Sequence, residues 1–274
     1  MIRVRALAVA SHPGPSLAIT AMVSLLAAEA APRGTGPVLA ILAMLAMQLS
    51  IGWSNDAFDA RRDAAAERTD KPVASGRIGI PAVWAAAVLA AAATLALSLA
   101  VGTDIFLVAV AMTAAGWAYN AGLKSTLASG LMYLAGFGLI PAYAAATLPG
   151  HPWPRWPVTL AAAVLGLGAH FANVLPDLTA DRAAGVRGLP QRVAAWRGPA
   201  AVRACALTLL LAASAVLLAA ARPEARPGAA AGLTVATVLA VIGARGGGRL
   251  PFIAAIGIAA VDVVMFAIGG EALT

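Results

Sequence analysis

The chain has 274 residues, of which 61% are hydrophobic and only 11% are charged, and its mean hydropathy is +0.85. A soluble domain with an ordinary charged surface cannot be built from this composition, so we expect the protein to lie in a membrane. The net charge of +7 at pH 7 does not indicate a nucleic-acid partner, because the basic residues are spread over the flanks of apolar segments and do not form one patch.

Apolar stretches rich in Ala, Leu and Val recur along the whole chain, and each is long enough to cross a hydrocarbon core about 30 Å thick as a helix. Their lengths predict about nine transmembrane helices. In chain order the expected spans are 14–31, 36–58, 79–101, 104–120, 125–147, 156–177, 199–221, 228–244 and 250–270. The predicted fold is therefore an all-α integral membrane protein, a single bundle built from two similar halves, with residues 1–274 forming one domain.

The basic residues predict the orientation of these spans. If the N-terminus lies inside, only Arg33, Arg155, Arg222 and Arg226 of the 19 Lys and Arg residues fall in outer segments. Basic residues in short loops are retained on the cytoplasmic side of a cell membrane. We therefore expect a multi-pass protein of the cell membrane with a cytoplasmic N-terminus, and with its two longest loops, about 59–78 and 178–198, also in the cytoplasm.

Acidic residues cluster at the cytoplasmic ends of the second and sixth spans. The chain has 12 Asp and Glu residues, and those in the two clusters are Asp56, Asp59, Asp63, Glu67, Asp70, Asp177 and Asp181. On a helix of 3.6 residues per turn, Asn55, Asp56, Asp59 and Asp63 project within an arc of about 100°. The second span is thus predicted to carry carboxylates along one side as it leaves the membrane.

The second cluster repeats the spacing of the first. Asn-x3-Asp-x3-Asp occurs as Asn55, Asp59 and Asp63 and again as Asn173, Asp177 and Asp181. His170, Asn173, Asp177 and Asp181 would fall within about 80° on the sixth helix, although Pro176 is expected to kink that helix or end its regular part. The repetition indicates two halves that face one site.

Two interpretations of these acids are open. They can form a solvated rim that is neutralised by salt bridges to Arg61, Arg62, Arg182 and Arg187. They can also hold magnesium, a hard cation that prefers oxygen ligands and is commonly bound by a few carboxylates together with substrate phosphates. The rim does not explain why the same spacing occurs twice, so magnesium and diphosphate binding is the preferred hypothesis.

Three segments resemble the UbiA-type intramembrane prenyltransferase superfamily, and the resemblance covers most of the chain. The first runs from Asn55 to Asp63 and continues into Lys71-Pro72-Val73-Ala74-Ser75-Gly76-Arg77, similar to the family's Asn-Asp-x2-Asp-x3-Asp and Arg-Pro-x2-Ser-Gly-Arg. The second runs from Asn173 to Pro190, and the third, weaker one is Tyr119-Asn120-Ala121-Gly122-Leu123-Lys124. Lys71 stands where the family usually has Arg, and Gly188 where it usually has Thr.

The resemblance implies transfer of a prenyl group from an isoprenoid diphosphate, with Mg2+ as cofactor, to a small aromatic or lipophilic acceptor such as a quinone or lipid precursor. It implies metal ligands at Asp56, Asp59, Asp63, Asp177 and Asp181, with Asp59, Asp177 and Lys124 carrying most of the catalysis. It implies diphosphate contacts from Lys71, Arg77, Lys124, Tyr119, Asn55 and Asn173. Lys71 and Arg77 can instead be ordinary cytoplasmic anchors.

Two other functions compete with prenyl transfer. Terpene cyclisation on the same scaffold would need the same acids. A cation-coupled transporter would place its ionisable groups near the bilayer midplane, where the sequence has only Asp262 and Glu29. A hydrogen bond to a neighbouring helix is the commoner role for an intramembrane Asp or His, and we expect it for Asp262 and His170. His170, one turn from Asn173, could also orient the acceptor or accept a proton.

Overall fold

The computed structural model describes residues 2–29 and 34–268, and throughout these ranges the regular structure is helical. The chain divides into two compact units. Unit 1 consists of Met1–Gly122 and Ala146–His151, and unit 2 of Leu123–Ala145 and Pro152–Thr274. The first Asp-rich motif belongs to unit 1 and the second to unit 2.

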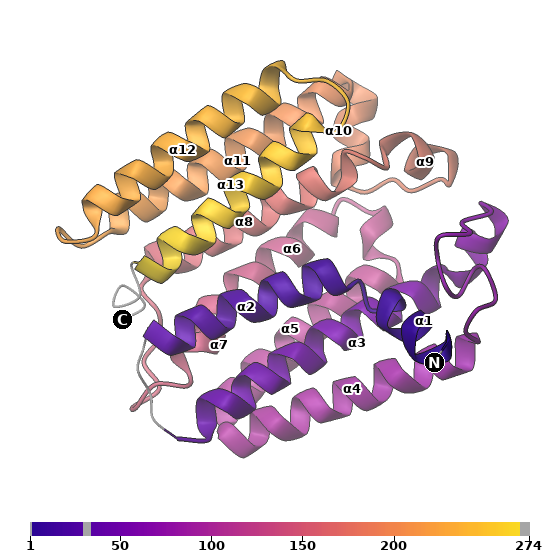
Figure 1. The fold of residues 1–274 in the computed structure, drawn as a ribbon, viewed down its shortest axis with the longest axis horizontal. Helices are drawn as coiled ribbons and strands as arrows, with labels where there is room; N and C mark the ends of the chain where they lie inside the picture. The colour runs from indigo at the N-terminus through magenta and orange to yellow at the C-terminus, as the bar shows by residue number, and fades with distance from the viewer. Residues whose placement is uncertain (1, 30–33, 269–274) are drawn as a thin grey trace. The chain divides into compact units, whose positions relative to one another are not determined.

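Unit 1 is built around one long helix, α3. Its helices are α1 (Ile2–Ala10), α2 (Pro13–Glu29), α3 (Gly36–Ala65), α4 (Ile80–Val101) and α5 (Thr103–Ala121). Helices α1, α2, α4 and α5 all pack against α3 (Figure 1). The buried hydroxyl of Ser50 donates to the Ala87 carbonyl of α4 at 2.8 Å and accepts from the Trp117 indole of α5 at 3.0 Å. In a membrane the hydrophobic effect does not drive helices together, because lipid tails are as apolar as the side chains, so interhelical hydrogen bonds of this kind contribute to packing.

Unit 2 contains the remaining helices. They are η1 (Leu123–Ser125), α6 (Ser129–Gly138), α7 (Ile140–Ala145), α8 (Trp156–Val174), α9 (Leu178–Ala183), α10 (Leu189–Arg197), α11 (Pro199–Ala220), α12 (Arg226–Arg245) and α13 (Leu250–Ile268). Helix α8 packs against α6, α11 and α13. Helices α11, α12 and α13 pack against one another (Figure 1). Close approach relies on glycine: a Cβ at Gly168 of α8 would lie 2.9 Å from the Leu210 side chain of α11.

Seven of the described helices are long and apolar enough to cross a membrane, namely α3, α4, α5, α8, α11, α12 and α13. Helices α1 and α2 form an eighth apolar segment, bent by 68° at its break. Residues Ser129–Ala145 form a shorter apolar segment, in which α6 ends before Pro141. All the expected spans therefore fall on helices, and the predicted all-α membrane fold is confirmed. The predicted ends of the first span at 31 and of the last at 270 lie outside the described residues.

The structure corrects the predicted loops. Helix α3 does not end near residue 58 but continues to Ala65, because the stretch after Phe58 is rich in Ala and Arg, which favour helix. The first loop is thus confined to residues 66–79. The second predicted loop, 178–198, is largely helical, since it contains α9 and α10.

Candidate functional site

The first Asp-rich motif lies entirely on α3. Asp56, Asp59 and Asp63 are only 1%, 6% and 6% exposed. Because α3 is unbroken through Ala65, a spacing of three and four residues places these carboxylates on the same side of the helix. The expected acidic face is therefore present, and it is buried in spite of its charge.

Cations neutralise this buried face. Lys71 lies between two of the acids, with its Nζ 2.7 Å from Asp56 Oδ1 and 3.5 Å from Asp63 Oδ2. Arg62 donates to Asp59 Oδ2 at 2.8 Å. Charges that are buried need such partners, since their desolvation costs several kcal/mol per ion. Of the salt bridges expected for a solvated acidic rim, the one from Arg62 is therefore present. Lys71 forms ion pairs with two of the candidate metal ligands, Asp56 and Asp63.

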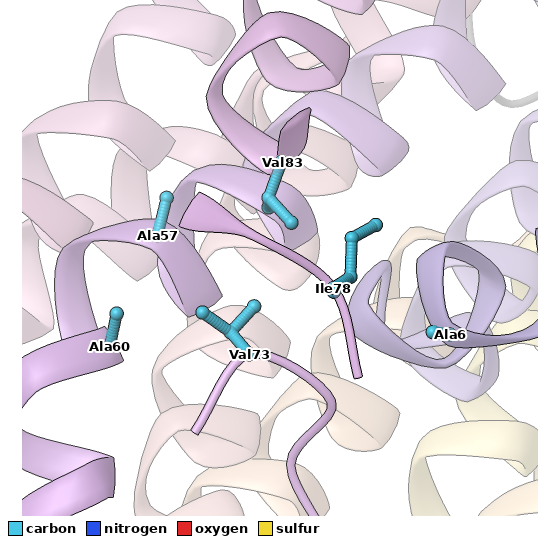
Figure 2. Close-up of a cluster of buried hydrophobic side chains, with 6 residues drawn as sticks. All are labelled: Ala6, Ala57, Ala60, Val73, Ile78 and Val83. Carbon is cyan, nitrogen blue, oxygen red and sulfur yellow. The ribbon is translucent and has the colours of Figure 1, made fainter. Parts of the chain in front are cut away.

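The loop after α3 is folded on itself and holds Lys71 in place. Arg77 donates to the carbonyls of Thr69 and Asp70 at 3.1 and 2.8 Å and to the Ser75 hydroxyl at 2.8 Å. Val73 and Ile78 anchor the loop in a buried cluster with Ala57 and Ala60 of α3, Ala6 of α1 and Val83 of α4 (Figure 2). In this structure Arg77 therefore supports the loop. Its contact with a diphosphate stays a prediction, as does that of Lys71.

Asn55 belongs to a polar network that the sequence did not reveal. Its side-chain amide donates to Asn120 Oδ1 of α5 at 3.1 Å, and the Asn120 amide donates to the Ile51 carbonyl and the Ser54 hydroxyl, both at 2.8 Å. Asn120 is only 4% exposed, and Tyr119 beside it is half-buried. A buried amide in an apolar helix is costly without hydrogen-bond partners. The position of Asn120 at the end of an apolar segment could therefore have indicated that its side chain has polar partners on another helix.

The second motif is not carried by one helix, and the expectation of a single face on the sixth span was wrong. Helix α8 ends at Val174, so exposed Asn173 lies in its last turn, while Asp177 precedes α9 and is also exposed. Pro176 has no backbone N–H, so it cannot continue the i→i−4 hydrogen bonds of α8. The Leu175 and Asp177 N–H groups bond instead to the Ala172 and Val174 carbonyls, three residues back, and this tighter turn separates α8 from α9. Asp181 lies on α9, where it accepts a hydrogen bond from Gln191 at 2.8 Å.

A buried serine ties the start of α10 to the helices of unit 2. The Ser129 hydroxyl accepts from the Leu189 backbone N–H at 2.8 Å and lies 3.0 Å from Nε2 of His170. The His170 ring stacks on Tyr133, with 4.5 Å between the ring centroids. His170 thus makes the interhelical hydrogen bond that is its commoner role. Lys124, in the adjacent η1, is half-buried.

The departure from the family pattern at Gly188 has a steric reason. A Cβ at this position would collide with the Lys124 carbonyl and lie 2.7 Å from Gln191 Oε1. We expect Gly188→Ala to displace η1 or the start of α10, to destabilise the protein by about 1–3 kcal/mol and to lower its activity. Thermal unfolding in detergent measures the first effect. Gly247→Ala is the matched control, because nothing lies within 4 Å of a Cβ there; equal midpoints for the two variants would contradict the prediction.

The acids of the first motif form a donor set for a hard cation that water and substrate phosphates would complete. Within residues 34–268 and the described N-terminal stretch, no three His, Cys, Asp or Glu side chains converge as ligands of one metal ion. Mg2+ does not require such a cluster, because it is usually bound by one or two carboxylates with water and substrate phosphates completing the shell. Asp56 Oδ2 is buried and has no hydrogen-bond partner among the described residues, so its capacity as an acceptor is unused. The donor set therefore suits Mg2+.

Asp262 lies apart from both motifs. It is completely buried on α13 and accepts a hydrogen bond from the Ser214 hydroxyl of α11. The expected role of Asp262 as an interhelical hydrogen-bond partner is therefore observed. The acids of the first motif form ion pairs with Lys71 and Arg62, whereas the partner of Asp262 is a hydroxyl.

Solved structures share the fold at low sequence identity. A UbiA homologue from Archaeoglobus fulgidus bound to DMAPP and Mg2+ matches with a TM-score of 0.71 and 17% identity, over 96% of this chain and 98% of that one. An apo UbiA homologue from Aeropyrum pernix K1 matches with a TM-score of 0.73 and 16% identity, over 90% and 96%. A digeranylgeranylglyceryl phosphate synthase matches with a TM-score of 0.71 and 13% identity, over 98% and 99%.

Sequence comparison gives the family. No curated protein sequence matches the chain. The model of the UbiA prenyltransferase family, however, matches residues 16–249, which include both Asp-rich motifs and every candidate site residue. Since this match extends over most of the chain and agrees with the fold of the solved structures, the protein belongs to the UbiA prenyltransferase family.

Proposed function

We propose that this protein is a Mg2+-dependent prenyltransferase that moves a prenyl group from an isoprenoid diphosphate to a small aromatic or lipophilic acceptor, of the quinone- or lipid-precursor type. In this proposal residues 1–274 form one enzymatic domain in the cell membrane, with the N-terminus and both motif segments on the cytoplasmic side. The observation that carries the proposal is the buried acidic face of α3, on which Asp56, Asp59 and Asp63 are held by Lys71 and Arg62.

The reaction breaks the bond between C1 of the prenyl chain and the diphosphate oxygen, and the electron pair leaves with the diphosphate. A new bond forms between C1 and an electron-rich carbon or oxygen of the acceptor, which releases one proton to water or to diphosphate. Mg2+ would neutralise the charge that develops on the leaving group. The proposed ligands are Asp56, Asp59 and Asp63 of the first motif and Asp177 and Asp181 of the second, with Asn55 and Asn173 in support.

The cations of the motifs have a second task in the proposal. Lys71, Arg77 and Lys124, together with the Tyr119 hydroxyl, would bind phosphate oxygens and so favour departure of the diphosphate. Solved UbiA homologues bound to DMAPP or GPP together with Mg2+ support a prenyl diphosphate as the substrate. Apolar helices around the prenyl chain would exclude water from the cation that forms.

The test is diphosphate release by the purified full chain, measured with prenyl diphosphates of increasing length, with and without aromatic and lipid acceptors, and with product mass spectrometry. We expect release that needs Mg2+ and an acceptor and that is lost in Asp59→Ala. Release without any acceptor, with a hydrocarbon or terpene alcohol as product, would instead establish a cyclase. A folded wild-type protein that turns over no prenyl diphosphate would refute the proposal.

A further inference from the structure

The break between α1 and α2 carries a histidine that reaches the first Asp-rich motif. His12 stands at this break, where the two helices are bent by 68°, and its φ of +54° is in the left-handed region. Its Nε2 lies 2.9 Å from Asp56 Oδ1. Since a carboxylate only accepts hydrogen bonds, Nε2 is the donor. A histidine 44 positions away in sequence thus contacts a proposed metal ligand.

The backbone around His12 is fixed against α3 by three further contacts. The Trp53 indole donates to the Leu7 carbonyl at 2.8 Å. A Cβ on Gly52 would collide with the Ser11 carbonyl, so the chain before His12 lies directly on α3. Ala6 packs into the buried cluster that also contains Ala57 and Ala60 of α3 (Figure 2). The position of the His12 ring is therefore determined by the packing of α1.

The two oxygens of Asp56 have different surroundings. Oδ1 accepts from both His12 and Lys71, the latter at 2.7 Å. Oδ2 has no hydrogen-bond partner among the described residues, and since Asp56 is only 1% exposed, bulk water does not solvate this oxygen either. A buried carboxylate oxygen without a partner is unfavourable unless a ligand completes it. Two donors on Oδ1 thus fix the side chain in an orientation that leaves Oδ2 without a donor from the described residues.

We infer that His12 is a positioning residue that orients Asp56 for Mg2+, and that α1 acts as the clamp that holds His12 there. This inference rests on the proposed function. Groups that hydrogen-bond a ligating carboxylate fix its orientation, and their loss typically weakens metal binding by about 10- to 100-fold. The φ of His12 is positive, a region that few residues other than Gly adopt but in which Asn, Asp and His are enriched, so a histidine suits the break between α1 and α2.

The test compares two substitutions of His12 in the full-length protein. In His12→Asn the backbone conformation is well tolerated, but the amide is too short to reach where Nε2 lies. In His12→Gln the amide nitrogen can take the place of Nε2. His151→Asn is the matched control, because His151 has a φ of +48° and lies beside Asp104, at 3.8 Å. Mn2+ binding without substrate, followed by electron paramagnetic resonance, and the Mg2+ concentration for half-maximal activity are measured for each.

We expect His12→Asn to weaken Mn2+ binding and to raise the half-maximal Mg2+ concentration by about 10- to 100-fold, with KM for the prenyl diphosphate at saturating Mg2+ unchanged. His12→Gln should restore binding, and His151→Asn should match the wild type. Unchanged Mn2+ affinity in folded His12→Asn would overturn the inference, as would an equal loss in His12→Gln. Failure of the proposed function would give a different result: the wild-type protein itself would bind Mn2+ no better than the Asp59→Ala variant does.

Discussion

Replacing Asp177 by Asn should lower the rate of diphosphate release by roughly 10²- to 10³-fold, the cost of removing one group that stabilises charge in a transition state. Asn keeps the shape of Asp but not its charge, so the affinity for Mg2+ should fall as well. The fold should be unaffected. Asp177 is exposed, makes no side-chain cap hydrogen bond to α9, and occupies a position before a helix that Asn suits equally well.

Asp70→Asn is the control for Asp177→Asn. Asp70 is also exposed, and it accepts two hydrogen bonds from Arg68, at 3.0 and 2.9 Å, which hold the pKa of its carboxyl below the ordinary value. Asp70 thus carries the same charge as Asp177, but Arg68 already binds both oxygens of its carboxylate. We expect full activity in Asp70→Asn and a thermal midpoint like that of the wild type in both variants. Full activity in Asp177→Asn would remove Asp177 from the proposed metal ligands.

Lys71→Met should lower the free energy of unfolding by about 3 kcal/mol, because it leaves the buried carboxylates of Asp56 and Asp63 without their shared cation. This value is at the low end for breaking a buried ion pair, since His12 and Arg62 remain beside the acids. Met has a length and an apolar stem similar to those of Lys, so packing is largely kept. Unfolding in detergent with and without Mg2+ is the measurement.

Magnesium should stabilise Lys71→Met more than it stabilises the wild type, since a bound divalent cation would replace the missing positive charge and binding to the folded state raises stability. Arg77→Met is the comparison. Arg77 is exposed, and among the described residues its hydrogen bonds go to two carbonyls of its own loop and to Ser75. We therefore expect a loss of about 1 kcal/mol and no extra response to Mg2+. The same response to Mg2+ in both variants would argue against a metal site on the acidic face of α3.

Periodicity and hydropathy were sufficient to predict the membrane fold, because each span is decided by its own composition. They also predicted the acidic face of α3, since helical spacing alone determines which side the acids occupy. They did not reveal how far α3 extends beyond its apolar part. Residues after Phe58 are polar, and hydropathy cannot distinguish a polar helix from a loop.

The partners of the acids were harder to predict. Lys71 was recognised as a motif residue, but its contacts with Asp56 and Asp63 depend on how the loop 66–79 folds back. His12 and Asn120 are separated from their contacts on α3 by dozens of residues, and no periodic pattern links such positions. In the second motif Pro176 correctly indicated the end of α8, whereas the formation of α9 directly after it depends on local hydrogen bonds that composition does not encode.

The continuity of α3 links the first motif to the thickness of the bilayer. A helix of 30 residues is about 45 Å long, whereas the hydrocarbon core is about 30 Å thick. Asp56, Asp59 and Asp63 are thus borne on a rigid extension of the membrane helix, and their height above the lipid cannot change unless the whole helix tilts or slides. Lipids that differ in acyl-chain length alter tilt through hydrophobic mismatch. Membrane composition can therefore shift the depth at which these carboxylates meet a lipid-borne substrate, without any change in the protein's sequence.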